Sequence, residues 1–279
     1  MNSAVGGWSV ALTDCDGVVD ELYRILTGWE LTRQFATAES VADVSIRKTD
    51  GGYSWESRRL TTPKQWDEIP PRTVMNVVSD IHDVLFDWFL SANPYPCLHT
   101  GAVRIGDGLV CFPSVRSSGK STLCAELVAC GHPLFCDDVL PIVPDTLRGF
   151  AMGIAPMLRL PLPKASSATL KQFAESRRGI SNQRWSYLYL MENEIAPFGT
   201  TAQIRHLVLL DRQRGGRARL VEIPAAEMLR EVILQNFGSR TDPDTVLNSL
   251  HALVSSTPCL KLTYSDLGEA REMLERHCR

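Results

Sequence analysis

The stretch Cys111-Phe-Pro-Ser-Val-Arg-Ser-Ser-Gly-Lys-Ser-Thr-Leu-Cys124 is the most informative part of this 279-residue sequence. It ends in Gly119-Lys120-Ser121, as does the phosphate-binding pattern G-x-x-x-x-G-K-[ST], in which backbone N–H groups and the lysine hold phosphates. Ser114 stands where this pattern has its first glycine. If Ser114 needed a left-handed backbone, we would expect a cost of roughly 1–3 kcal/mol. The stretch therefore predicts a phosphate loop with one unusual residue.

The flanking residues predict the order strand, loop, helix, strand and acidic pair. Leu109 to Phe112 predicts a strand that enters the loop, and the helix that starts at Lys120 is expected to end near Gly131. A short strand, Leu134 to Cys136, precedes Asp137-Asp138, at the position expected of a magnesium-binding acidic group. Adjacent carboxylates on an extended segment point in roughly opposite directions, so we expect the two to have different roles. The alternative is an ordinary turn after a strand.

The composition is that of an ordinary globular protein. Hydrophobic residues make up 44% of the sequence, charged residues 22%, and the net charge is −3, so a broad basic surface for nucleic acid is not expected. No apolar run approaches the ~20 residues that span a bilayer, and the start, MNSAVGGWSV, lacks both a basic leader and an apolar signal core. We therefore expect a cytoplasmic protein that binds neither nucleic acid nor membrane.

The eight cysteines are expected to be free thiols. Most of them lie in apolar strand or helix contexts, where reduced cysteine behaves as a small hydrophobic residue. Cys124, Cys130 and Cys136 follow one another at a spacing of six with His132 nearby, which raises the alternative of a metal cluster. Zinc sites usually use tighter pairs such as C-x2-C, and the sequence has none, so we expect no such cluster.

Residues 1–95 predict a small α+β module, and residues 96–279 a larger α/β domain. In the first, the alternating stretches Val44 to Lys48 and Tyr53 to Ser57 flank Thr49-Asp-Gly-Gly52, a turn signal that predicts a hairpin. After Pro70-Pro71, apolar residues recur with helical period, and Asn93-Pro-Tyr-Pro96 is the expected linker. The recurring residues are Val74, Val77, Val78, Ile81, Val84, Leu85, Trp88 and Phe89.

The second part of the chain continues the α/β alternation. Leu98 to Ile105 predicts one strand, with a tight turn at Gly106-Asp-Gly108. The polar segment 163–186 is expected to be a mobile loop that can include one short helix, either a lid or a solvated connection. Beyond it we expect strands near 204–211, 218–223 and 259–264, helices near 225–237 and 243–256, and a final helix from Asp266.

Three elements together resemble the catalytic domain of the bacterial HPr kinase/phosphorylase family: Leu98-His99, the loop ending Gly119-Lys120-Ser121, and Gly131-His-Pro-Leu-Phe-Cys-Asp-Asp138. The same order is similar to that of phosphoenolpyruvate carboxykinases. More closely, the chain resembles the shorter HPr kinase-related proteins, including kinases that modify lasso peptides. The match covers residues 97–143 well. The resemblance implies an α/β fold with an HPr kinase C-terminal-like, P-loop-containing catalytic domain.

The same resemblance implies ATP, Mg2+ and phosphoryl transfer to a serine or threonine hydroxyl. It gives His99 the place of the family's active-site histidine, Lys120 and Ser121 its phosphate and magnesium contacts, and Asp137-Asp138 its base and metal pair. We favour Asp137 as the base and Asp138 as the metal ligand. The expected nucleotide-binding residues are Ser114, Val115, Arg116, Ser117, Ser118, Gly119, Lys120, Ser121 and Thr122.

The expected function is therefore an ATP-dependent kinase acting on a peptide or protein. The alternatives are a small-molecule kinase with the same core and a catalytically inactive nucleotide-binding regulatory protein. The family's glycine-rich signature downstream of the aspartates is not found, since Gly149 to Arg159 occupies that region, so HPr itself and the reverse phosphorylase reaction are not expected. Arg159 is a candidate phosphate or substrate contact, and assembly into homo-oligomers is left open.

Overall fold

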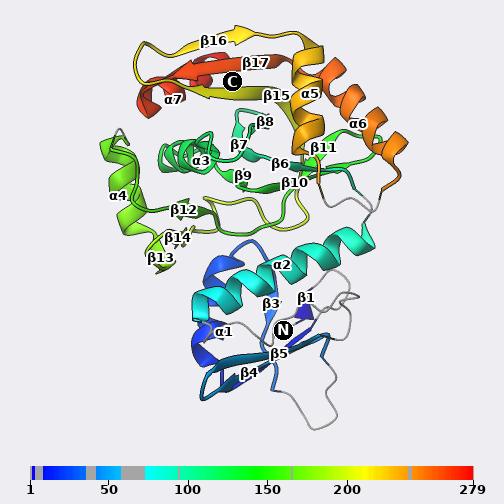
Figure 1. Ribbon diagram of the computed structural model, residues 1–279, viewed down its shortest axis with the longest axis vertical. Helices are drawn as coiled ribbons and strands as arrows, with labels where there is room; N and C mark the ends of the chain where they lie inside the picture. The colour runs from blue at the N-terminus through cyan, green and yellow to red at the C-terminus, as the bar shows by residue number, and fades with distance from the viewer. Residues whose placement is uncertain are drawn as a thin grey trace.

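The computed structural model describes residues 2–3, 9–35, 42–57, 73–93, 95–164, 166–237 and 241–278, which form a mixed α/β structure (Figure 1). Residues considered above that lie outside these ranges include Met1, 4–8, Pro70-Pro71, Pro94 and Ala165. In Figure 1 the N-terminal elements lie at one end of the molecule, and the sheet that carries the phosphate-loop sequence lies at the other. Helix α2 (Val74–Ala92) crosses between the two regions.

The N-terminal region contains the predicted hairpin and helix. Strands β4 (Val44–Thr49) and β5 (Gly52–Ser57) pair antiparallel with Thr49 opposite Gly52, and Gly52 has a φ of 133°, which glycine adopts without strain. β2 (Val10–Thr13) adds a parallel strand to β4, and α1 (Asp16–Ile25) follows it. A separate two-stranded sheet joins β1 (Asn2–Ser3) to β3 (Leu31–Thr32). Helix α2 begins at a capping box between Thr73 and Asn76, so the helix and the hairpin are both confirmed.

The large sheet has nine strands and is mixed in direction. Its main path is β6-β10-β11-β15-β8-β7-β9, while β17 pairs with β15 and β16 with β17. β8, β15 and β17 run parallel, so their carboxyl ends lie at one edge of the sheet. The bounds are β6 Cys97–His99, β7 Gly101–Ile105, β8 Gly108–Phe112, β9 Leu134–Cys136, β10 Val139–Val143, β11 Arg148–Phe150, β15 Thr201–Arg212, β16 Arg219–Glu222 and β17 Cys259–Tyr264.

Helices cover both faces of this sheet. Side chains alternate along β8, so Val110 and Phe112 pack with α3 (Lys120–Ala129) and α7 (Leu267–His277). Leu109 and Cys111 face the other way, toward α5 (Ala225–Gln235) and α6 (Pro243–Ser256). These helices and strands confirm the α/β order expected after residue 200. Among the helices of the described residues, none combines the length and the apolar character needed to cross a membrane.

The strand expected from Leu98 to Ile105 is in fact two strands. Its halves have different neighbours: β6 pairs with β10, whereas β7 pairs with β8 and β9. The break falls at the fully buried Thr100, whose backbone N–H donates to the Asp138 carbonyl at 3.1 Å. The single-strand prediction was wrong because alternation along the chain does not show a change of partner.

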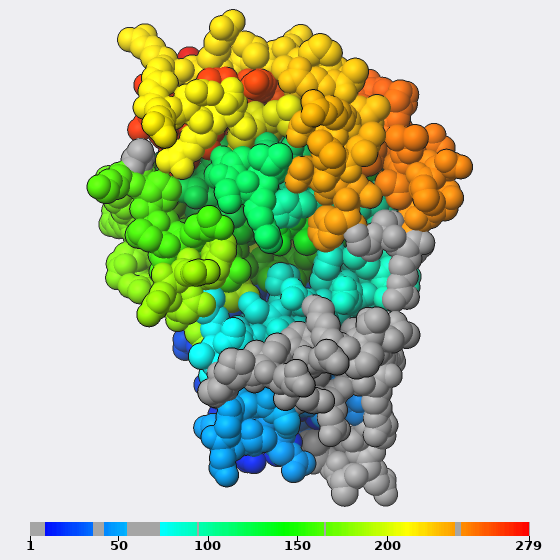
Figure 2. Space-filling model, viewed as in Figure 1, coloured from blue at the N-terminus to red at the C-terminus, as the bar shows by residue number. Residues whose placement is uncertain are grey.

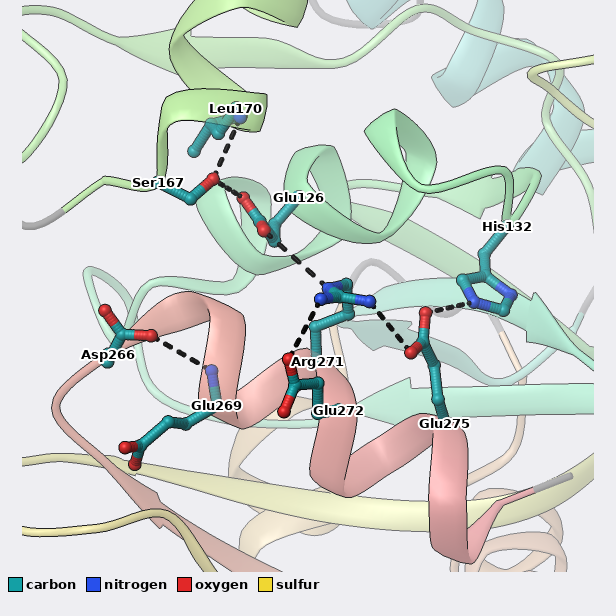
Figure 3. Close-up of polar contacts among 9 residues, drawn as sticks. All are labelled: Glu126, His132, Ser167, Leu170, Asp266, Glu269, Arg271, Glu272 and Glu275. Carbon is teal, nitrogen blue, oxygen red and sulfur yellow. Dashed lines mark hydrogen bonds and ion pairs between the residues drawn. The ribbon is translucent and has the colours of Figure 1, made fainter.

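The described residues of the polar segment 163–186 include one short helix, as the sequence allowed, and strands that the expected loop did not include. It contains α4 (Ala168–Ser176), β13 (Arg178–Ser181) and the start of β14 (Trp185–Leu188), which lies between β13 and β12 (Met157–Arg159) in a three-stranded sheet. Ser167 caps α4 by accepting from Leu170 N at 2.9 Å, and its hydroxyl donates to the buried Glu126 of α3 at 2.5 Å (Figure 3). This tertiary contact orders a segment whose composition predicts a loop.

The N-terminal region is packed tightly against the rest of the chain. The Trp29 indole N–H donates to the Met152 carbonyl at 2.7 Å, and its ring stacks on Phe198 with centroids 3.9 Å apart. Apolar side chains of α1 and α2 form one core with Ala155 and Tyr187. Figure 2 shows the cyan surface of α2 between the blue N-terminal residues and the green central part of the chain.

All eight cysteines are free thiols, as expected, and seven of them are buried. His132 does not join them in a metal cluster; its Nε2 lies 3.0 Å from Glu275 Oε1 on α7 (Figure 3). Within the described residues, no group of three or more His, Cys, Asp or Glu side chains is arranged to hold a metal ion.

Candidate active site

The phosphate-loop sequence forms a tight turn between β8 and α3. Ser118 N donates to the Val115 carbonyl at 3.2 Å, and Ser117 and Gly119 have left-handed φ angles of 68° and 100°. When left-handed and right-handed backbone conformations alternate along a loop, successive N–H groups point to the same side and create a concavity that suits an anion. Helix α3 begins directly after Gly119, so its first unpaired N–H groups lie at the same place.

Ser114 does not carry the strain that its position in the motif suggested. Its φ is not left-handed; among non-glycine residues of the loop, Ser117 has that conformation. The Ser114 side chain is buried, and its hydroxyl accepts a hydrogen bond from Leu210 N of β15 at 2.9 Å. The condition for a conformational cost at Ser114 is therefore not met, and the serine forms a hydrogen bond that glycine cannot replace.

Lys120, the first residue of α3, points back into the loop. Its side chain is buried, and its Nζ donates to the Ser114 carbonyl at 2.6 Å and to the Val115 carbonyl at 3.2 Å. Burial lowers the pKa of Lys120, while the nearby charges of Asp138 and Asp137 act in the opposite direction. Lys120 and both aspartates therefore lie within electrostatic reach of one another at the start of α3.

Asp137 follows β9 and faces the first turn of α3. Its Oδ2 accepts from Met157 N at 3.3 Å, and its Oδ1 is buried without a hydrogen-bond partner among the described residues. Burial raises the pKa of Asp137 to about 6, and the Ser121 hydroxyl, which faces the same carboxylate, acts to lower it. Such a carboxylate has unused capacity for a cation or a proton.

Asp138 points to His99 on the neighbouring strand. The Asp138 Oδ1 lies 2.7 Å from His99 Nδ1, and the antiparallel pairing of Val139 with His99 fixes this approach. Limited hydration acts to raise the pKa of Asp138, but the hydrogen bond and charge of His99 hold it below its usual value. Because 63% of the Asp138 side chain is exposed, a reactant can approach this pair.

Helix α2 adds a residue that no motif indicated. His82 lies close enough to Asp138 for their charges to interact, and burial lowers the pKa of His82 while Asp83 and Asp138 act to raise it. One turn along α2, Phe86 contacts Phe237, which in turn lies beside His99. The helical periodicity of this segment predicted only core packing, so the approach of α2 to the site could be seen only in the tertiary structure.

The other residues predicted to bind nucleotide or substrate make fewer contacts than Lys120, Asp137 and Asp138. Arg116 is exposed and close enough to Lys120 to help lower the pKa of that lysine, and Val115 is 57% exposed. Thr122 lies in the first turn of α3. Arg159 lies over the Trp185 ring, with its guanidinium carbon 5.0 Å from the ring centroid, two residues beyond Met157.

The residues present fit a nucleotide and a divalent cation. Two buried oxygens at the loop, Ser118 Oγ and Asp137 Oδ1, have no hydrogen-bond partner within the described part of the chain. Mg2+ is usually held by one or two carboxylates together with substrate phosphates, so a group of three protein ligands is not needed. A hydroxyl, a carboxylate and a lysine at a helix N-terminus are a suitable donor set for a magnesium-bound polyphosphate.

Comparison with known proteins gives little additional information. No protein-family model matches the sequence, and no curated protein matches it. One solved structure to which the chain is similar is the Hpr(Ser) kinase/phosphatase from Coxiella burnetii, with 13% sequence identity and a TM-score of 0.33 over 66% of this chain and 93% of that chain. Both values are low, so we infer the function from the residues of the site.

Proposed function

We propose that this chain is an ATP-dependent kinase that transfers the γ-phosphoryl group to a serine or threonine hydroxyl of a peptide or protein. One observation supports this more than any other: the phosphate-loop lysine lies within electrostatic reach of the His99–Asp138 pair, whose oxygen and nitrogen are 2.7 Å apart. A protein that only binds nucleotide needs the loop but has no use for an exposed carboxylate paired with a histidine.

In this proposal the loop and the start of α3 hold the phosphates. Backbone N–H groups around Ser117 and Gly119 bind phosphate oxygens, and Lys120 exchanges its loop carbonyl acceptors for them. Bound Mg2+ would neutralise charge on the phosphate oxygens. Ser121 and Asp137 face each other and would hold this cation, since the unpartnered Asp137 Oδ1 has free acceptor capacity.

The acceptor hydroxyl then approaches the exposed Asp138. This carboxylate takes the hydroxyl proton as general base, and His99 Nδ1 orients the carboxylate. The acceptor oxygen bonds to the γ-phosphorus as the bond to the β–γ bridging oxygen breaks, and ADP is the leaving group. The contacts favour this division of roles over the reverse one expected from the sequence, in which Asp137 was the base and Asp138 the metal ligand. Asp138 is open to an acceptor, whereas Asp137 is turned toward Ser121 and Met157 N.

The proposal is tested by incubating the protein with labelled ATP, Mg2+ and a library of peptides that each carry one serine or threonine. We expect phosphate on peptide hydroxyls, located by mass spectrometry, and a loss of roughly 10²-fold or more in turnover for Lys120→Ala. Lys171→Ala, which changes an exposed lysine of α4, is the matched control and should leave turnover unchanged.

Three other outcomes would contradict the proposal in different ways. Phosphate transfer only to small hydroxyl compounds would identify a small-molecule kinase. Binding of ATP without transfer or hydrolysis would identify an inactive nucleotide-binding protein. Equal turnover of Lys120→Ala and the unchanged chain would exclude the loop as the catalytic nucleotide site.

A further inference from the structure

Tyr264, the last residue of β17, is buried in an unusual way. Only 1% of the residue is exposed, and its hydroxyl has no hydrogen-bond partner among the described residues. A buried hydroxyl without a partner destabilises a fold unless something else satisfies it. By contrast Tyr187, which is equally buried, has its hydroxyl 3.1 Å from Ser79 Oγ. The Tyr264 hydroxyl is therefore available to donate a hydrogen bond to a bound ligand.

The Tyr264 hydroxyl lies next to the start of helix α3. β17 runs parallel to β15, as β8 does, so Tyr264 ends at the same sheet edge as the strand that leads into the phosphate loop. A Cβ atom placed on Gly119 would lie 2.9 Å from the Tyr264 hydroxyl oxygen. Gly119 is the N-cap of the ten-residue helix α3, where N–H groups lack helical acceptors.

A second hydroxyl beside Gly119 has the same property. Ser118 Oγ, from the preceding residue, is also buried without a partner in the described part of the chain. Together with the Lys120 ammonium, the site thus offers two unused hydroxyl donors and one cation around the start of α3. This set of donors suits an anion with several oxygens, such as the phosphate chain of a nucleotide.

We propose that the phenolic hydroxyl of Tyr264 donates a hydrogen bond to a phosphate oxygen of the nucleotide bound at the loop, from the side of β17. This inference rests on the proposed function, because it assigns a further residue to the same nucleotide site. Burial raises the pKa of Tyr264 to about 12, so the phenol keeps the proton that it donates at neutral pH.

The test compares Tyr264→Phe with the matched control Tyr187→Phe. Each substitution removes one buried hydroxyl and keeps the ring. Calorimetric titration with Mg·ATP and with inorganic tripolyphosphate should give about tenfold weaker binding for Tyr264→Phe and unchanged binding for Tyr187→Phe. Adenosine serves as a probe without phosphates, and any affinity for it should be equal in all three proteins.

The stability of the free proteins gives a second, independent readout. Tyr264→Phe removes a hydroxyl without a partner, so its unfolding midpoint in denaturant should stay unchanged or increase. Tyr187→Phe removes the hydrogen bond with Ser79, so its midpoint should decrease. If the Tyr264 hydroxyl only stabilised the fold, Tyr264→Phe would have a lower unfolding midpoint and an unchanged affinity for phosphate, and this result would contradict the inference.

The results separate the failure of this inference from the failure of the proposed function. If the unchanged chain binds neither Mg·ATP nor tripolyphosphate, the nucleotide site itself is wrong. If it binds both and Tyr264→Phe binds them equally well, Tyr264 makes no phosphate contact. Should Tyr264→Phe fail to fold, ζ-13C labelling of the six tyrosines in the unchanged chain replaces it. The Tyr264 resonance should then shift on saturation with tripolyphosphate, and an unshifted resonance would overturn the inference.

Discussion

The hydroxyl of Ser114 accepts a hydrogen bond from the backbone N–H of Leu210 at 2.9 Å, and this contact joins the loop between β8 and α3 to β15. Beyond Leu207, β15 is no longer paired with β8, so Leu210 N needs another acceptor on that side. Ser114 supplies it from the start of the loop. A residue that looks like a defect in the motif is thus a structural contact that positions the loop.

Replacing Ser114 with glycine matches the phosphate-binding pattern, but it should lower the stability of the protein and its affinity for Mg·ATP. Ser114→Gly leaves Leu210 N without an acceptor and should lower the free energy of unfolding by about 1–3 kcal/mol. Weaker Mg·ATP binding should accompany this loss, because the loop is less fixed. Chemical denaturation and calorimetry measure the two effects, and Val115→Ala, at an exposed loop position, is the control for the denaturation. Unchanged stability of Ser114→Gly would mean that the hydrogen bond contributes nothing.

The roles of the two aspartates can be separated by comparing binding with turnover. Asp138→Asn removes the proposed base but not the proposed cation ligand, so phosphoryl transfer should fall by roughly 10²-fold or more while Mg·ATP affinity stays near normal. Asp137→Asn should weaken the dependence of ATP binding on Mg2+ concentration. Titration of ATP at several Mg2+ concentrations, together with single-turnover assays, distinguishes the two variants. The opposite pattern would restore the assignment expected from the sequence.

The Glu275 carboxylate should make the stability of the protein depend on pH. Burial acts to raise the pKa of Glu275, but hydrogen bonds from His132 and Arg271 hold it below its usual value (Figure 3). A lowered carboxylate pKa means that the unfolded state binds more protons, so the stabilisation is present above pH ~4.5 and is lost as the pH falls below it. Glu275→Gln should cost about 1–3 kcal/mol at pH 7 and much less at pH 3.

Glu272 on the same helix provides the control for this measurement. Its side chain is 59% exposed and lies 3.4 Å from Arg271, so Glu272→Gln should change the unfolding free energy little at either pH. Denaturant titrations of both variants between pH 3 and pH 7 give the comparison. A constant difference between Glu275→Gln and the unchanged chain over this range would contradict the proposed cause.

The contact between Gly28 and Gly153 should control how the N-terminal region packs on the rest of the chain. A Cβ on Gly28 would lie 2.6 Å from Gly153 Cα, and Gly28 also donates to the Gly153 carbonyl at 3.2 Å. Gly28→Ala should therefore lower the free energy of unfolding by about 1–3 kcal/mol, because backbone must move to make room. Gly51→Ala is the control, since a Cβ there meets nothing within 4 Å.

Activity of the same two variants tests whether this packing matters for catalysis. Helix α2 brings His82 into electrostatic reach of Asp138, so displacement of the N-terminal region should also reduce phosphoryl transfer by Gly28→Ala. Limited proteolysis reports the displacement directly. If Gly28→Ala is cleaved faster but transfers phosphate at the normal rate, the N-terminal region only stabilises the fold.

Local sequence patterns predicted those elements whose signals lie close together along the chain. The hairpin of β4 and β5, helix α2, and the series of β8, loop, α3 and β9 all follow from alternation, helical period and glycine positions. The same patterns failed at Thr100 and in segment 163–186. There the outcome depends on pairing with distant strands and on the contact between Ser167 and Glu126, which lie 41 residues apart along the chain.

By itself the sequence determined the α/β alternation, the start of helix α3 at Lys120 after Gly119, and the presence of two aspartates after β9, because each depends on residues that are neighbours along the chain. Only the tertiary structure decided that Asp138 pairs with His99, that Ser114 supports β15, and that Tyr264 and His82 reach the site. Those relationships depend on strand order and helix packing, which bring together side chains that no local pattern connects.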